Sequence, residues 1–203
     1  MTSTTTTATS AATRQPEIDR LPAAALTAAA AAWGIAVAWG ASDGVFAALP
    51  RPLIAAIVAV TIAVPTAAFL ASPRLLAVAS ALGQRRIIAF HLWRIPAALL
   101  FFWLGLQGAL PPLFWILAGT GDLVAGLLAG WTIRRPVTRD AALAFHRFGF
   151  ADFVVAVGTG LSFTLLNDPR MAPVAMLPLA LVVLYGVGIS GVSHLVSFRL
   201  LRR

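Results

Sequence analysis

Residues 111–130 read PPLFWILAGTGDLVAGLLAG, an apolar stretch with a single charged residue, Asp122, near its middle. About 20 helical residues of this kind cross a hydrocarbon core of about 30 Å. A carboxylate at the centre of such a helix costs roughly 2.5–3.5 kcal/mol on insertion scales. The stretch therefore predicts a transmembrane helix in which Asp122 needs a partner or a use.

The composition extends this prediction to the whole chain of 203 residues. Hydrophobic residues make up 60% of it and charged residues only 11%, whereas soluble domains carry about 25% charged residues. Helices satisfy their own backbone hydrogen bonds in lipid, so we predict an all-α, polytopic membrane protein whose partner is the lipid bilayer. A polar Thr- and Ser-rich segment, residues 1–20, is predicted to be a disordered cytoplasmic tail. Residues 21–203 are predicted to form a bundle of six transmembrane helices, with spans at 21–42, 53–72, 87–108, 111–133, 141–166 and 174–198.

The distribution of arginine predicts the orientation of these spans. All fifteen basic residues are Arg. With a cytoplasmic N-terminus, eleven of them fall on the cytoplasmic side, and only Arg51 and Arg170 fall on the outer side. This asymmetry follows the positive-inside rule, so both termini are predicted to be cytoplasmic. Membrane topology also explains the net charge of +8 without a nucleic-acid partner.

Shorter sequence features predict an interfacial helix, a helical hairpin and two kinks within the bundle. Residues 73–86 (PRLLAVASALGQRR) are too few to span and suit a short helix at the inner interface. The uncharged connection around Leu110 and Pro111 predicts an antiparallel hairpin of the third and fourth spans. Pro65 and Pro96 fall inside predicted spans and predict kinks there.

Charged and titratable side chains gather in the third to sixth spans. At about 1.5 Å per residue, Asp122 and Asp152 both lie roughly 16 Å from one end of their spans, near the midplane, and Arg94 lies roughly 10 Å from the inner end of its span. Intramembrane ionisable groups mark pathways and binding sites. The candidates for a proton or small-solute site are therefore Asp122, Asp152, Arg94, Arg147 and His146, with His91 and His194 as secondary candidates.

Two alternatives to such a site stay open. In a structural or accessory membrane subunit, Arg94 and Arg147 would pair with Asp122 and Asp152 only to hold the helices together. In a haem-binding or membrane-embedded enzyme, the three histidines would be ligands. However, the chain has no Cys, no HExxH motif and no two histidines at i,i+4. The sequence thus predicts no catalytic residue, no metal and no cofactor. It favours a protein that binds or moves a small solute or a proton, and leaves the substrate and the oligomeric state open.

The last 115 or so residues resemble an uncharacterised family of bacterial integral membrane proteins with six spans. One departure concerns His146, which stands where the family usually has Asn. The resemblance implies a multi-pass protein of the bacterial inner (plasma) membrane and implies no activity. The segments that carry it are Arg94, Leu110-Pro111, Ala118-Gly119-Thr120-Gly121-Asp122, His146-Arg147-Phe148-Gly149-Phe150-Ala151-Asp152 and His194-Leu195-Val196-Ser197-Phe198.

Overall fold

The structure is a computed structural model that describes residues 20–202. The predicted tail lies outside the described residues, apart from Arg20. The described residues form helices and no strand, which confirms the all-α fold class, and six helical stretches are long and apolar enough to cross a membrane. The elements are α1 (Arg20–Ser42), α2 (Arg51–Ala71), α3 (Pro73–Phe90), η1 (His91–Trp93), α4 (Arg94–Leu106), α5 (Pro112–Ile133), α6 (Arg139–Leu165), η2 (Pro169–Ala175), η3 (Leu181–Gly186) and α7 (Val187–Leu201).

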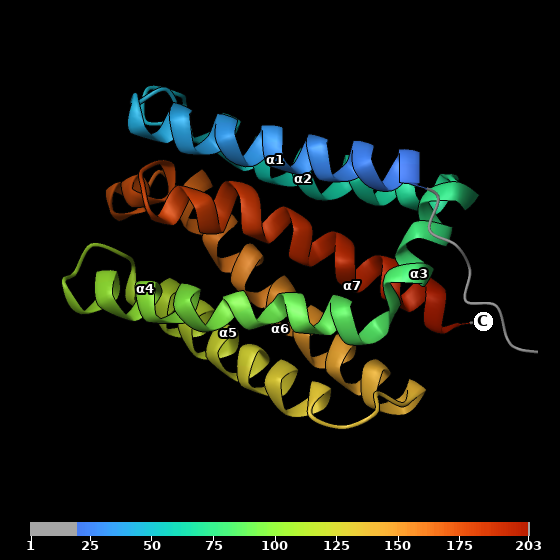
Figure 1. Cartoon of the computed structure of the whole chain (residues 1–203). Helices are drawn as coiled ribbons and strands as arrows, with labels where there is room; N and C mark the ends of the chain where they lie inside the picture. Colours follow the sequence, from blue (N-terminus) through green and yellow to red (C-terminus); the bar gives the residue numbers. More distant parts are fainter. Residues whose placement is uncertain (1–19, 203) are drawn as a thin grey trace, which may run out of the picture.

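The long helices lie side by side, as Figure 1 shows. Helices α1 and α2 are on one side of the bundle, α4 and α5 are on the other, and α6 and α7 lie between them (Figure 1). Helices α4 and α5 pack tightly against each other and are joined by residues 107–111 only, so the predicted hairpin is present. A Cβ on Gly105 would overlap the ring of Trp115, so this glycine sets how closely the two helices approach.

Helix α3 carries the chain across the end of the bundle at which the C-terminus lies (Figure 1). Gly83 interrupts it with φ 74° and ψ 154°, a conformation that is essentially restricted to glycine. The short helix predicted from residues 73–86 is therefore present but ends at this break. The side chain of Ser72 caps its start by accepting a hydrogen bond from the backbone N of Leu75 at 3.4 Å.

The two prolines predicted to kink spans occupy different positions. Pro65 lies inside α2, as predicted. Pro96 lies at the third residue of α4, directly after the 3-10 turn η1. Because proline has no backbone N–H to donate to the carbonyl of Leu92, the helix is irregular just before Pro96, inside the third candidate span, Pro73–Leu106.

The last span begins later than the sequence predicts. Its helix runs from Leu181 to Leu201, not from residue 174. Pro169, Pro173 and Pro178 lack the backbone N–H that an α-helix needs, and residues 169–175 form the 3-10 helix η2 instead. Beside it, the side chain of Arg170 donates hydrogen bonds that lower the pKa of Asp168 to about 2. The last span then opens with the π-helical turn η3.

Candidate functional site

Arg94 brings together the two carboxylates that the sequence places near the midplane. It begins α4, and its Nε donates to Oδ1 of Asp122 on α5 at 2.6 Å. Its Nη2 donates to Oδ2 of Asp152 on α6. Arg94 is 3% exposed and Asp122 is 8% exposed. We name Arg94, Asp122 and Asp152 the charged cluster; with both carboxylates ionised, its formal charge is −1.

Small residues let the helices close around the charged cluster. A Cβ on Gly121 would overlap the carboxylate of Asp152, and a Cβ on Gly126 would lie 2.6 Å from Cγ1 of Ile95. The glycine that precedes Asp122 in the sequence therefore makes room for the second carboxylate against α5. Close approach through small residues is common between membrane helices.

Arg147 does not join the charged cluster. Its side chain is exposed on α6, while its neighbour His146 is fully buried. Among residues 20–202 the ion pairs are Arg94–Asp122, Arg94–Asp152 and Arg170–Asp168. The pairing considered for Arg147 and a carboxylate is absent from these residues, because successive residues on a helix point about 100° apart.

A cavity of about 280 Å³ adjoins the charged cluster. Arg94 and Asp122 line it together with mostly apolar residues of α2, α4, α5, α6 and the last span. Ala59 of α2 and Leu161 of α6 also line it and are exposed, so the cavity reaches the outer surface of the bundle between these two helices. This contribution from α2 could not be predicted, because its apolar residues have the composition of any lipid-facing helix.

Three buried polar atoms in the cavity-lining residues have no hydrogen-bond partner within the described part of the chain. They are Nε1 of Trp93, Nη1 of Arg94 and Oγ of Ser190. The first two can only donate, and the serine hydroxyl can donate or accept. Buried polar groups are normally paired. The arrangement therefore suits a bound molecule that presents a hydrogen-bond acceptor.

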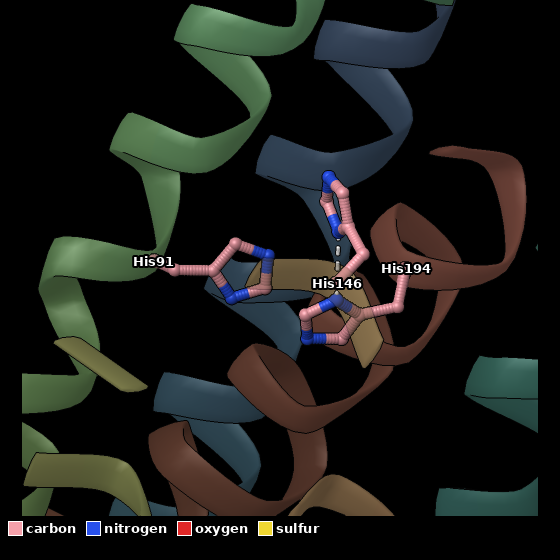
Figure 2. Close-up of side chains that lie close together, drawn as sticks. All are labelled: His91, His146 and His194. Atoms are coloured by element: carbon pink, nitrogen blue, oxygen red, sulfur yellow. Dashed lines mark hydrogen bonds between the residues drawn. The ribbon is translucent and has the colours of Figure 1, made fainter. Parts of the chain in front are cut away.

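The three histidines of the chain form a second group, which we name the histidine cluster. His91 of η1, His146 of α6 and His194 of α7 are all 0% exposed, and their rings face one another in Figure 2. One nitrogen from each ring lies within 4.8 Å of the others. These side chains are able to hold a metal ion, although the sequence motifs predict no metal site.

The histidine cluster is held by polar partners. Nδ1 of His146 lies 2.9 Å from Nδ1 of His194, the contact dashed in Figure 2. Nε2 of His146 lies 2.9 Å from Oε1 of Gln84, and Nε2 of His91 lies 2.8 Å from Oγ of Ser193. Gln84 and Ser193 are functional candidates that the sequence reasoning missed, because nothing in their local sequence marks them.

One comparison with known proteins gives a match. A family described as a domain of unknown function (DUF8737) matches residues 51–202, a range that includes the charged cluster and the histidine cluster. No curated protein and no solved structure matches the chain. The chain therefore belongs to the DUF8737 family, which agrees with the resemblance to an uncharacterised membrane family.

Proposed function

We propose that the protein binds a small, mostly apolar solute inside the membrane and moves it together with a proton. The observation that carries this proposal is the apolar cavity beside the charged cluster, three of whose lining residues, Trp93, Arg94 and Ser190, each have a buried polar atom without a partner in the described residues. A cavity of this kind, with few polar groups among apolar walls, is typical of small-molecule sites.

The lining residues define the class of solute. Apolar walls favour an apolar body, and the unpaired N–H groups of Trp93 and Arg94 favour an oxygen acceptor. The formal charge of −1 on the charged cluster disfavours an anion. We therefore expect a neutral solute with a carbonyl or similar oxygen. The opening between α2 and α6 allows entry from the lipid phase.

The charged cluster supplies the carboxylates that would bind the proton. Two carboxylates share one guanidinium, so a proton on either carboxylate makes the cluster neutral while Arg94 keeps an ionic partner. A solute that binds Nη1 of Arg94 touches the same guanidinium. Solute binding and proton binding would then be energetically coupled, and that coupling is reciprocal.

A second candidate function is a structural membrane subunit. It is favoured by the way Arg94 ties α4 to both α5 and α6, since a buried charge network can fix helix packing without chemistry. This alternative explains the ion pairs but assigns no role to the cavity or its unpaired polar atoms.

Benzophenone tests the proposal directly, because it has an apolar body and one carbonyl and forms covalent adducts when irradiated. The reconstituted protein should be labelled in the cavity-lining parts of α2 and α6. An excess of cyclohexanone should reduce labelling more than methylenecyclohexane, which has the same shape without the oxygen. Ala156→Leu, which fills the cavity, should lower labelling at least tenfold, and Ala67→Leu on the exposed face of α2 should not.

Proton movement is read in the same proteoliposomes with an entrapped pH dye. Cyclohexanone should accelerate proton flux in the wild type. Asp122→Asn or Asp152→Asn should remove this acceleration, whereas Asp168→Asn in the exposed loop should keep it. Labelling scattered over the lipid-facing helices, or flux unchanged in both variants, would favour the structural subunit.

A further inference from the structure

We propose that His91, His146 and His194 form a binding site for a first-row divalent transition metal such as Zn²⁺. This site is separate from the proposed solute site, because none of the three histidines lines the cavity. The three rings come from η1, α6 and α7, so a metal there would join the start of α4 to the last two long helices.

The spacing of the nitrogens is close to that of a metal site. Two ligands at about 2.0–2.1 Å from one tetrahedral ion lie roughly 3.3–3.4 Å from each other. The Nδ1 atoms of His146 and His194 are 2.9 Å apart. One nitrogen of each ring lies within 4.8 Å of the others, so shifts of roughly 1–1.5 Å are needed to reach this spacing. The His91 ring also has to turn, because it is stacked on the His194 ring with centroids 4.4 Å apart.

The hydrogen bonds around the cluster show which nitrogens are free of protons. Oγ of Ser193 donates to the carbonyl of Ser190 at 2.8 Å, so it accepts a hydrogen bond from Nε2–H of His91. The amide oxygen of Gln84 can only accept, so it accepts from Nε2–H of His146. Neutral His91 and His146 therefore have proton-free Nδ1 atoms. Oxygen partners on the far nitrogen are the usual second-shell arrangement of metal-bound histidine.

The protonation of His194 follows from that of His146. Because Nδ1 of His146 is proton-free, Nδ1–H of His194 donates to it, and Nε2 of His194 is proton-free. Both this Nε2 and Nδ1 of His91 are buried and have no partner in residues 20–202. A metal ion would replace the shared proton between the two Nδ1 atoms, and that proton would move to Nε2 of His194. The ring stays neutral, and the buried Nδ1 of His91 gains a partner.

The surroundings leave room for a small ion at this place. Arg94 begins α4 one helical turn after His91. A Cβ on Gly149 would lie 2.5 Å from Cε1 of His194, so this glycine keeps the space beside the ring. Gln84, which contacts His146, is half-buried and adjoins the exposed Arg85, so the histidine cluster lies close to the surface. Imidazole ligands suit Zn²⁺, Cu²⁺, Ni²⁺ and Co²⁺, and three protein ligands leave a position open.

The test uses Co²⁺ as a spectroscopic probe on the full chain, purified in detergent with a tag that contains no histidine. The chain has only three histidines and no cysteine, so a visible d–d spectrum with imidazole character reports on this cluster alone. We expect one Co²⁺ per chain, displacement by Zn²⁺, and a higher apparent Tm with either ion.

Variants separate metal binding from folding. His146→Asn and His194→Asn should weaken Co²⁺ binding at least 100-fold. Gln84→Leu and Ser193→Ala leave the three ligands in place and should weaken it about 10–100-fold, while Asp168→Asn in the loop after α6 should keep full binding. Absence of Co²⁺ and Zn²⁺ binding by the wild type, or equal binding by the histidine variants, would overturn the proposal.

Discussion

At the scale of single residues, Arg94 is the group on which the charged cluster depends. It is buried, and it is the ionic partner of both Asp122 and Asp152. Removing one partner of a buried charge pair costs about 3–5 kcal/mol, because the remaining charge stays buried without compensation. The loss of Arg94 leaves two such carboxylates side by side.

Arg94→Gln should therefore lower the free energy of unfolding by about 3–5 kcal/mol. The same substitution at Arg147, which is exposed and makes no ion pair with a described residue, should change it by no more than about 0.5 kcal/mol. Chemical denaturation in detergent, followed by circular dichroism, measures both values. Equal effects of the two variants would contradict the central place given to Arg94.

The depth of each charged residue within its predicted span allowed part of the site to be predicted from the sequence. Counting residues from the span ends placed Asp122 and Asp152 at the same height, and the structure joins both to Arg94. The same counting placed the three histidines at similar depth, but it could not show that their rings meet. Its members lie on separate helices without a local motif, and they meet only because η1, α6 and α7 converge in space.

At the scale of helices, glycines decide how closely the elements approach. Gly121 and Gly158 show the contrast, since a Cβ on Gly121 would overlap the carboxylate of Asp152, whereas a Cβ on Gly158 would meet no atom within 4 Å. Both residues lie in helices, where Ala is intrinsically more stable than Gly by about 0.8–1.0 kcal/mol.

Gly121→Ala should thus destabilise the protein and disrupt the ion pair between Asp152 and Arg94. Gly158→Ala should be neutral or stabilising, by up to about 1 kcal/mol. Thermal unfolding of the two variants gives the comparison, and loss of the cyclohexanone-dependent proton flux only in Gly121→Ala would connect the packing to function. A stable, fully active Gly121→Ala protein would show that α5 and α6 lie further apart.

The helix boundaries show what an apolar run can and cannot predict. Apolar runs predicted the bounds of five spans to within a few residues, the third being counted from the break at Gly83. The last run failed because residues 174–180 are apolar but follow and include prolines, and hydrophobicity does not register the missing N–H groups. The break at Gly83 could not be predicted from the sequence either, since only the backbone conformation shows that the chain turns there.

At the scale of the whole molecule, the arginine distribution predicts which end of the bundle faces the cytoplasm. The chain contains no cysteine, so single cysteines can report on each end. Asp43 follows α1 and Pro136 lies between α5 and α6, at opposite ends of the bundle, and both are exposed. In intact cells, an impermeant maleimide should label Asp43→Cys and leave Pro136→Cys unlabelled.

Inverted membrane vesicles should reverse this pattern, which controls for the reactivity of each cysteine. Labelling of Pro136→Cys in intact cells would reverse the predicted topology. The six-helix architecture does not depend on that outcome, since it follows from the length and composition of the helices. Orientation, by contrast, depends on the charges in the loops.

The hairpin of α4 and α5 also sets the order in which charges enter the membrane during synthesis. The ribosome completes Arg94 and Asp122 before Asp152, and residues 107–111 are too short to keep α4 and α5 apart. Arg94 and Asp122 can therefore enter the membrane as a neutral pair, although either alone costs roughly 2.5–3.5 kcal/mol to insert. Asp152 follows on α6, after Arg94 has been inserted and can pair with it. With this order, no isolated carboxylate has to be buried in lipid.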